Sequence, residues 1–126
     1  MGDFVPQNAL ERELKRVRAG ETSMHGFLGL FSESELVVPS GGEVMPDGSG
    51  FQPLLFDKEG VQMVACFTSP ERIRDFASLA PHSLAVVGRE FLLLIPTGYG
   101  LVVNPGQFVG FDVTPDGLRK IVAEFV

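Results

Sequence analysis

Apolar residues near the N-terminus recur at helical spacing. Three of them fall at positions i, i+4 and i+7: Leu10, Leu14 and Val17. Asn8 stands where an N-cap is needed and Glu11 lies three residues after it, so the pattern predicts an amphipathic helix over residues 8–19. Glu11 also precedes Lys15 by four residues, which predicts a weak ion pair between the two on the helix surface.

Two later segments also favour helices. A short helix is indicated by Phe27, Leu28, Leu30 and Phe31, despite the glycines beside them. Near the C-terminus, Thr114 followed by Pro115 is typical of a helix start. The apolar residues that then share one face are Leu118, Ile121, Val122 and Phe125. Residues 89–95, which are apolar from Phe91 onward, show no clear period and fit either a short helix or a strand.

Strand patterns fill much of the remaining chain. Single strands are predicted at residues 35–39, 83–87, 101–103 and 109–111. The clearest pattern is a hairpin, in which residues 53–56 and 61–67 flank a short turn that contains Gly60. Between the last two strands, Asn104 is followed by Pro105 and Gly106, an order that favours a type II turn.

One segment has the composition of a loop. Residues 40–50 are rich in Gly, Ser and Pro and predict a mobile loop, or alternatively a binding loop.

A further helix is predicted after residues 68 and 69. Thr68 and Ser69 precede Pro70, so a helix begins there with one of the two as N-cap, and it ends by Pro81. The residues that this helix is expected to bury are Ile73, Phe76 and Ala77.

Helices and strands are interspersed along the chain. This order predicts the α+β class, with a mixed β-sheet of about five strands and helices packed on it. Hydrophobic residues make up 44% of the 126 positions, which is enough to build one core and argues against a disordered chain. No internal repeat or linker divides residues 1–126, so we expect a single domain.

Charge and cysteine content narrow the classes of function. The formal net charge of −6 opposes binding to nucleic acid and to anionic membranes. The longest apolar run, residues 91–95, is far too short to cross a bilayer, and the first residues show no basic leader followed by an apolar segment. Cys66 is the only cysteine, so no intrachain disulfide is available and a cytoplasmic location is expected.

Ser69 is the most specific candidate for chemistry, because it stands between a predicted strand and a predicted helix start. It lacks the Gly-x-Ser-x-Gly frame of a nucleophile elbow, so an N-cap is the favoured interpretation. The same helix start, with Arg72 nearby, can instead bind a small anion or a carboxylate of a partner.

Other candidates give weaker signals. His25 and His82 lack the spacing of a metal site, so neither a metal nor a cofactor is expected. Cys66 forms a catalytic dyad with a histidine only if the fold brings them together, and its apolar neighbours favour an inert thiol. The Gly-x-Gly patterns at residues 48–50 and 98–100 do not continue into a nucleotide-binding motif.

Several segments occur in an order that resembles a known family. They are NALEREL (residues 8–14), ELVVP (35–39), FTSPER (67–72) and LVVNPG (101–106), followed by the helix that begins at Thr114. This order is similar to the N-terminal domain of the SseB family, named after enhanced serine sensitivity. The resemblance implies a bacterial, cytoplasmic, mixed α/β domain without an established enzymatic activity. Many family members carry a second, C-terminal domain, which this chain is too short to contain.

The residues and the resemblance together favour a domain that binds or regulates another protein without catalysis. The expected contact residues are Thr68, Ser69, Arg72, Asn104 and Gly106. They form one surface only if the FTSPER and NPG segments meet at one edge of the sheet. A homodimer is a second option, since 11 Phe residues leave enough apolar area for an exposed patch.

Two alternatives come from other classes of function. A small hydrolase or transferase would use Ser69 or Cys66 as nucleophile and a histidine as base, within about 3 Å of each other. A small-anion site would use the helix start near Ser69 and Arg72. The distances between these side chains in the folded chain discriminate among the three hypotheses.

Overall fold

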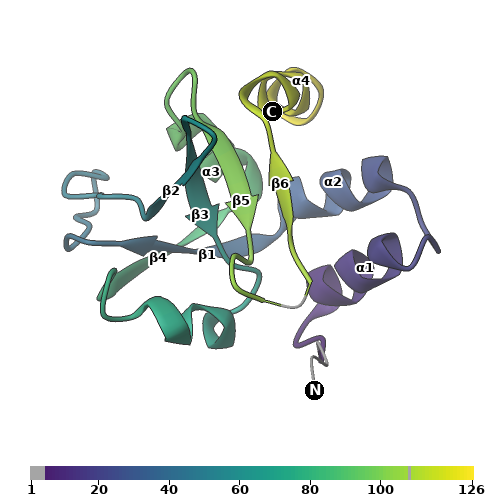
Figure 1. The fold of residues 1–126 in the computed structure, drawn as a ribbon, viewed down its shortest axis with the longest axis horizontal. Coiled ribbons are helices and arrows are strands. Elements are labelled where there is room, and N and C mark those ends of the chain that lie inside the picture. The colour runs from purple at the N-terminus through teal and green to yellow at the C-terminus, as the bar shows by residue number, and fades with distance from the viewer. Residues whose placement is uncertain (1–4, 108) are drawn as a thin grey trace.

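The computed structural model describes residues 5–107 and 109–126, with helices and strands interspersed along the chain (Figure 1). The helices are α1 (Ala9–Arg18), α2 (Met24–Glu33), the 3-10 helix η1 (Pro70–Phe76), α3 (Gly88–Leu94) and α4 (Pro115–Phe125). The strands are β1 (Glu35–Ser40), β2 (Leu55–Lys58), β3 (Val61–Cys66), β4 (His82–Val87), β5 (Gly100–Val103) and β6 (Phe111–Val113). The predicted α+β class is confirmed.

The strands form two sheets, and isolated bridges link β1 of the smaller sheet to Phe67 after β3 and to Pro53 before β2. The larger sheet has the order β2-β3-β5-β6, with β3 and β5 parallel and the other neighbours antiparallel. The smaller is a ribbon of β1 and β4, which are antiparallel. Val37 of β1 exchanges two backbone hydrogen bonds, of 2.9 and 2.8 Å, with Phe67 just beyond β3. Where the sequence predicts a single sheet of about five strands, the described residues form six strands in two joined sheets.

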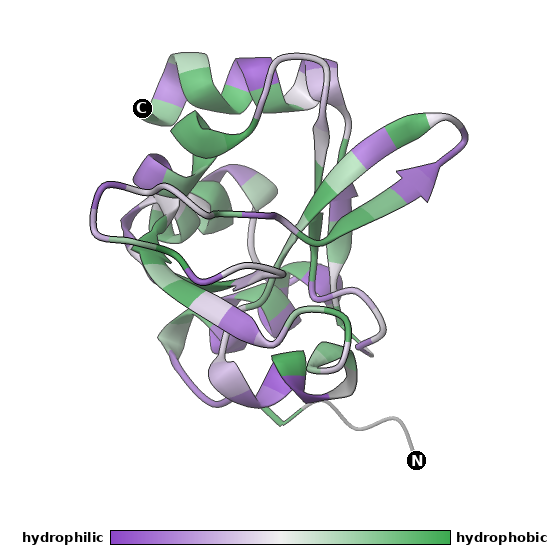
Figure 2. Ribbon diagram, turned by 90° about the vertical axis from the view of Figure 1, so that its left-hand side faces the viewer, coloured by the Kyte–Doolittle hydropathy of each residue, from purple (hydrophilic) through white to green (hydrophobic). Residues whose placement is uncertain are grey.

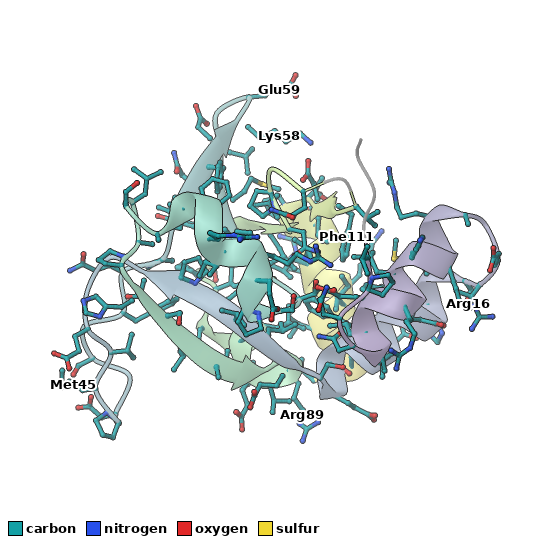
Figure 3. All side chains as sticks on the ribbon, turned by 90° about the horizontal axis from the view of Figure 1, so that it is seen from below. Arg16, Met45, Lys58, Glu59, Arg89 and Phe111 are labelled. Carbon is teal, nitrogen blue, oxygen red and sulfur yellow. The ribbon has the colours of Figure 1, made fainter. Side chains whose placement is uncertain are left out.

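Two turns follow the geometry that Gly and Pro predict. Glu59 and Gly60 join β2 to β3 with φ angles of 53° and 87°, the conformation that connects antiparallel strands tightly. Gly106 has φ 77°, and Gln107 N–H donates to the carbonyl of Asn104 at 3.1 Å, as in a type II turn. Figure 2 shows the β2–β3 hairpin projecting with a hydrophilic turn, and Figure 3 labels Lys58 and Glu59 at its tip.

The helices cover the sheets around one hydrophobic core. The predicted apolar faces are buried: Leu10 and Leu14 of α1 and Leu118 and Ile121 of α4 all belong to this core. Its largest buried side chains come from other elements and include Phe27, Phe31 and Phe91. Each such aromatic or aliphatic side chain stabilises the fold by roughly 1.5–3 kcal/mol through its removal from water.

Segment 41–50 forms a loop that is tied back to the end of β1. Gly41 N–H donates to the carbonyl of Gln52 at 2.8 Å, and Met45 N–H donates to the carbonyl of Ser49 at 2.9 Å. The hydroxyl of Ser40 accepts a further hydrogen bond from Gln52 N–H at 3.0 Å. These bonds close the loop at its base, so β1 and β2 are held together.

Two local predictions differ from the structure, namely the start of one strand and the burial of Ala77. The strand predicted at 109–111 begins only at Phe111. Residues 88–94 form a helix, which is one of the two alternatives left open there. The helix after Ser69 is a 3-10 helix that ends at Phe76. Because it ends there, Ala77 lies at its C-cap and is exposed, whereas Ile73 and Phe76 are half-buried.

Candidate functional site

The FTSPER and NPG segments meet where the parallel strands β3 and β5 end. Parallel neighbours end at the same edge of a sheet, so Thr68 after β3 lies beside Asn104 after β5. Thr68 N–H donates to Asn104 Oδ1 at 3.0 Å, and Asn104 Nδ2 donates to Thr68 Oγ1 at 2.9 Å. Gln107 Nε2 adds a bond to the carbonyl of Arg72 at 3.2 Å. The structure therefore brings the two segments together.

Asn104 joins this corner in an uncommon backbone conformation. Its φ angle is 55°, in the left-handed region that asparagine tolerates better than most residues. Its backbone N–H donates to the carbonyl of Cys66 at 2.9 Å, and its side chain also donates to the carbonyl of Val109 at 3.2 Å. Together with its bond to Thr68 N–H, this residue thus satisfies three polar backbone groups, which come from residues 66–68 and from Val109.

Glu11 extends the same network from α1. Its carboxylate is 0% exposed and accepts a two-pronged bond from Arg72, with Nη2 to Oε1 at 2.8 Å and Nε to Oε2 at 3.1 Å. Thr68 Oγ1 and the N–H of Gln7 donate to it as well. The predicted surface ion pair between Glu11 and Lys15 is wrong, because the start of α1 packs on the corner and turns the carboxylate inward. Glu11, Thr68, Arg72 and Asn104 form what we name the polar cluster.

Hydrogen bonds decide the ionisation of Glu11. Burial alone raises the pKa of its carboxyl, but the bonds from Arg72, Thr68 and Gln7 outweigh this effect and hold the pKa below the ordinary value of 4.5. Because the folded pKa lies below the unfolded one, ionised Glu11 stabilises the fold above the unfolded value. That contribution is lost as the pH falls through the folded value.

Stability is therefore expected to decline in acid, in part through Glu11. The free energy of unfolding of wild type, measured by urea denaturation, should fall below about pH 4.5, whereas Glu11→Gln should show a smaller decline over the same interval. Glu59→Gln, at the exposed hairpin tip, removes one charge without touching the polar cluster and serves as the control. Equal declines in wild type and Glu11→Gln would exclude Glu11 as a cause.

Most of the predicted contact residues are buried within this corner. Thr68, Ser69 and Asn104 are only 1–2% exposed, and the side chain of Arg72 is 12% exposed and paired with Glu11. Gly106 is exposed. A partner can therefore touch Gly106 directly, while the buried residues determine the shape of the corner. The small-anion hypothesis relied on the positive charge of Arg72, but Glu11 already neutralises that guanidinium.

A groove of about 480 Å³ lies beside the corner, and we name it the Ser69 groove. Its lining comes from the first turn of α1, from residues 68–70, and from the ribbon, including Glu35, Val37, Ser83 and Ala85. Figure 3, seen from below, shows η1 crossing the ribbon with α1 beside it. Ser69 Oγ is buried here and contributes slightly to the low pKa of Glu11, but it has no hydrogen-bond partner of normal geometry in the described part of the chain.

The geometry gives the catalytic hypothesis no dyad. His25 lies against Glu124 and Phe125, and His82 begins β4 opposite Ser40. Within residues 5–107 and 109–126, no hydrogen bond links either histidine to Cys66 or to Ser69. Cys66 is fully buried, and this burial raises the pKa of its thiol. A thiol that stays protonated is a poor nucleophile.

Cys66 is accordingly expected to resist thiol reagents in the folded protein. Labelling with 5,5′-dithiobis(2-nitrobenzoate) should be slow in buffer and rapid in denaturant, because the thiol must be exposed before it ionises and reacts. The rate, followed by absorbance, should rise with urea in parallel with unfolding. Rapid labelling in buffer at neutral pH would contradict the burial of this side chain.

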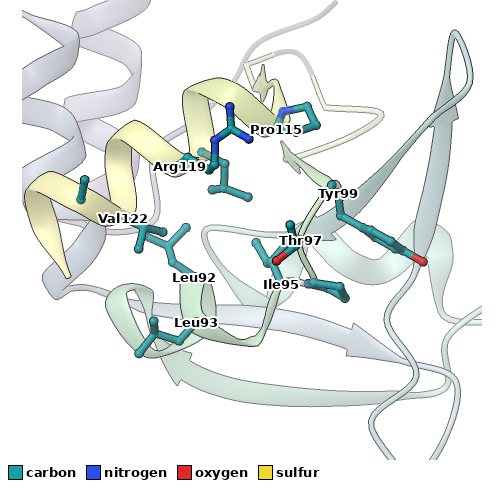
Figure 4. A pocket seen from close by; sticks show the side chains of 12 residues that line it. Leu92, Leu93, Ile95, Thr97, Tyr99, Pro115, Arg119 and Val122 are labelled. Carbon is teal, nitrogen blue, oxygen red and sulfur yellow. The ribbon is translucent and has the colours of Figure 1, made fainter.

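A second hollow, of about 420 Å³, lies between α3, the loop that follows it and α4 (Figure 4). Leu93 of α3 and Val122 of α4 line it, and Arg119 at its edge pairs with Asp116 one turn away on its own helix. Leu93 is 65% exposed. The hollow is mainly apolar and gathers no group of titratable side chains.

Among the described residues, no helix combines the length and the apolar character that a membrane crossing requires. In the same part of the chain, no three side chains of His, Cys, Asp and Glu gather closely enough to hold a metal ion. The polar cluster and the Ser69 groove are thus the features in which the predicted site residues take part.

Comparison with known proteins matches the same region of the chain. The family model of the SseB protein N-terminal domain matches residues 10–120, which include the whole polar cluster. The chain belongs to this family. Neither the curated proteins nor the solved structures gave a match. The resemblance carried by FTSPER and NPG is therefore confirmed at the level of the family, and in this SseB domain both segments build the buried corner.

Proposed function

We propose that this SseB domain recognises another protein in the bacterial cytoplasm, and that it does so without catalysis by binding a partner segment in the Ser69 groove. The observation that carries the proposal is the hydroxyl of Ser69, which is buried at a groove and has no hydrogen-bond partner of normal geometry among the described residues. An unsatisfied buried polar group costs about 1–3 kcal/mol. A partner group that enters the groove and bonds to the hydroxyl would remove this cost.

The lining of the groove favours a polypeptide as ligand. Glu35 is the only charged residue that lines it, and most of the others are small or apolar. Such a surface lacks the basic side chains that phosphates and nucleic acids require, and the net charge of −6 repels them further. A single buried thiol without a disulfide is compatible with a reducing cytoplasm.

The polar cluster gives this groove a fixed shape. Asn8 Nδ2 donates to the carbonyl of Thr68 at 2.8 Å, and Asn104 holds the N–H of the same residue. The backbone on the N-terminal side of Ser69 is therefore held from α1 and from the NPG turn. A preformed groove loses little conformational entropy when a partner binds, so more of the contact energy appears as affinity.

An affinity capture with a matched control tests the proposal. The tagged chain is incubated with a lysate of its host, and retained proteins are identified by mass spectrometry. Ser83→Arg places a bulky cation in the groove, while Ser78→Arg makes the same change at an exposed residue outside its lining. The proposal expects a stoichiometric partner that wild type and Ser78→Arg retain and Ser83→Arg loses. Equal retention by both variants would place the contact elsewhere.

Ser69→Ala measures the contribution of the hydroxyl itself. Its removal should change the free energy of unfolding by less than about 1 kcal/mol, since the hydroxyl makes no hydrogen bond of normal geometry with the described residues of the free protein. The affinity for the captured partner should fall roughly threefold to tenfold, as expected for the loss of one hydrogen bond. Thermal denaturation and fluorescence anisotropy give the two values. Unchanged affinity would remove the role assigned to the hydroxyl.

A further inference from the structure

We infer that the partner segment is an extended strand, which adds to the open edge of β4 and places a basic side chain over the Ser69 groove. This inference rests on the proposed function and specifies the form and charge of the segment that binds. It starts from the hydrogen bonding of the β1–β4 ribbon.

The register of the ribbon shows which backbone groups of β4 face outward. Val37 lies opposite Ala85, yet both of its backbone bonds go to Phe67 on the other side of β1. In an antiparallel pair, the residue opposite such a position directs its own N–H and C=O away from its neighbour. The N–H and C=O of Ala85, and of Ser83 two residues earlier, therefore point to the open edge. No described residue makes a hydrogen bond with these four groups.

The sequence of β4 lacks the features that normally protect an edge strand. Natural edges carry charged residues, prolines or bulges, which prevent another strand from pairing. The six residues His82–Val87 contain no Lys, Arg, Asp, Glu or Pro, and their six-residue register with β1 runs without a bulge. Ser83 and Ala85 are exposed, and β1 is the only strand that pairs with β4 in the described part of the chain. The edge is suited to accept a further strand.

The groove and the edge are continuous. Glu35, Val37, Ser83 and Ala85 occupy alternate positions of the ribbon, so they share one face, and all four line the groove. In a strand added to β4, the residue opposite Ala85 points to this same face. Backbone bonds at the edge and a side chain in the groove can therefore act together, which is the usual basis of recognition by strand addition.

The charge of the face identifies the side chain. Glu35 is exposed and is the only charged residue of the lining, and the exposed Glu71 follows Pro70 at the opposite side of the groove. Because the protein as a whole carries −6, it attracts a cationic segment and repels an anionic one. A lysine or arginine opposite Ala85 is long enough to approach Glu35 across the ribbon. The partner segment is thus extended and basic.

Peptide display supplies a defined probe. A library of random twelve-residue peptides is selected against the full chain, and the tightest peptide is synthesised with a fluorescent label. The inference expects extended peptides enriched in Lys and Arg. On binding, the amides of Ser83 and Ala85 should become at least tenfold slower in hydrogen–deuterium exchange, since they gain strand hydrogen bonds. Failure to select any peptide, or unchanged exchange at these two amides, would overturn the inference.

Two variants at one position separate backbone from side-chain effects. Ala85→Pro removes the N–H of residue 85, which points to the open edge and makes no bond to β1. The ribbon should therefore stay paired, because proline is tolerated where the N–H of a strand faces solvent. It should weaken peptide binding by at least roughly tenfold. Ala85→Thr keeps the N–H and should stay within about threefold of wild type. Equal binding by Ala85→Pro and wild type would contradict strand addition, and if Ala85→Pro fails to fold, the exchange of wild type decides.

The basic side chain has its own test. Replacing the lysine or arginine of the selected peptide by alanine should weaken binding to wild type several-fold, but should have little effect with Glu35→Gln. An equal loss with both proteins would exclude Glu35 as the partner of that cation. These measurements use the peptide of the selection, so they do not depend on finding the natural partner.

The outcomes distinguish the inference from the function on which it rests. Binding that Ser83→Arg abolishes and Ala85→Pro leaves intact would support the Ser69 groove and reject strand addition. If neither Ser83→Arg nor Ala85→Pro weakened peptide binding, both the Ser69 groove and strand addition would be rejected. The remaining alternative is that the edge of β4 pairs with a second copy of this chain, which sedimentation equilibrium of the free protein tests. A wild-type dimer that Ala85→Pro converts to monomer would show such pairing and would overturn the assignment to another protein.

Discussion

Replacing Arg72 by alanine should lower the free energy of unfolding by about 3–5 kcal/mol, as is typical when one member of a buried ion pair is removed. The carboxylate of Glu11, which is 0% exposed in wild type, loses its guanidinium partner, because both prongs of the bond are removed. Domains of this kind are stable by only about 5–15 kcal/mol in total. The change is measured as the shift of the urea denaturation midpoint.

Two matched variants define this effect. Arg74→Ala lies on the same short helix at an exposed position and should change stability by less than about 0.5 kcal/mol. Arg72→Lys keeps the charge but cannot form the two-pronged bond, so it should fall between wild type and Arg72→Ala. If Arg72→Ala and Arg74→Ala unfolded at the same urea concentration, the ion pair would contribute nothing measurable.

The elements of the fold could be predicted from local patterns. Helix caps and tight turns depend on residues within about four positions, so a short stretch of sequence is enough to predict them. Examples are the caps at Asn8 and Thr114 and the turn at Glu59–Gly60. Periodicity located α1 and α4 for the same reason. Residues 88–94 resisted prediction because the short apolar run that begins at Phe91 fits a buried strand as well as a short helix, and only the packing of α3 on α2 and α4 decides between them.

The candidate site was predicted only in part. The sequence proposed Thr68, Ser69 and Asn104 as one surface only if the FTSPER and NPG segments meet, and the parallel pairing of β3 and β5 explains why these segments do meet. It did not show that their side chains are buried. Spacing along α1 suggested Lys15 as partner of Glu11, whereas the actual partner is 61 residues away. No local rule reports a contact at that separation.

The Ser69 groove was even harder to predict from the sequence. It requires the ribbon, the start of α1 and the corner after β3 to converge, and none of these segments is unusual by itself. One signal was available: residues 82–87 form an uncharged strand in a chain that otherwise carries many charges. Uncharged edges are uncommon in nature. Whether such a strand is an edge, however, depends on the pairing of β1 and β4, which the sequence does not specify.

Asn104→Ala should lower the free energy of unfolding by about 3 kcal/mol. The substitution leaves the buried N–H of Thr68 without its acceptor, which costs about 1–3 kcal/mol. It also forces alanine into a backbone with φ 55°, at a further cost of about 1–2 kcal/mol. Asn104→Gly loses the same side-chain bonds but accepts this φ without strain, so it should be more stable than Asn104→Ala by about 1 kcal/mol.

The order of these two variants separates the two contributions. Thermal and urea denaturation of wild type, Asn104→Ala and Asn104→Gly would give the values, with Gln107→Ala as a neighbouring control that removes one bond to the carbonyl of Arg72. Equal stability of the alanine and glycine variants would show that the left-handed backbone carries no strain. A stability of Asn104→Gly equal to that of wild type would instead show that the hydrogen bonds to Thr68 and Val109 do not stabilise the corner, and that its shape is set by the strands alone.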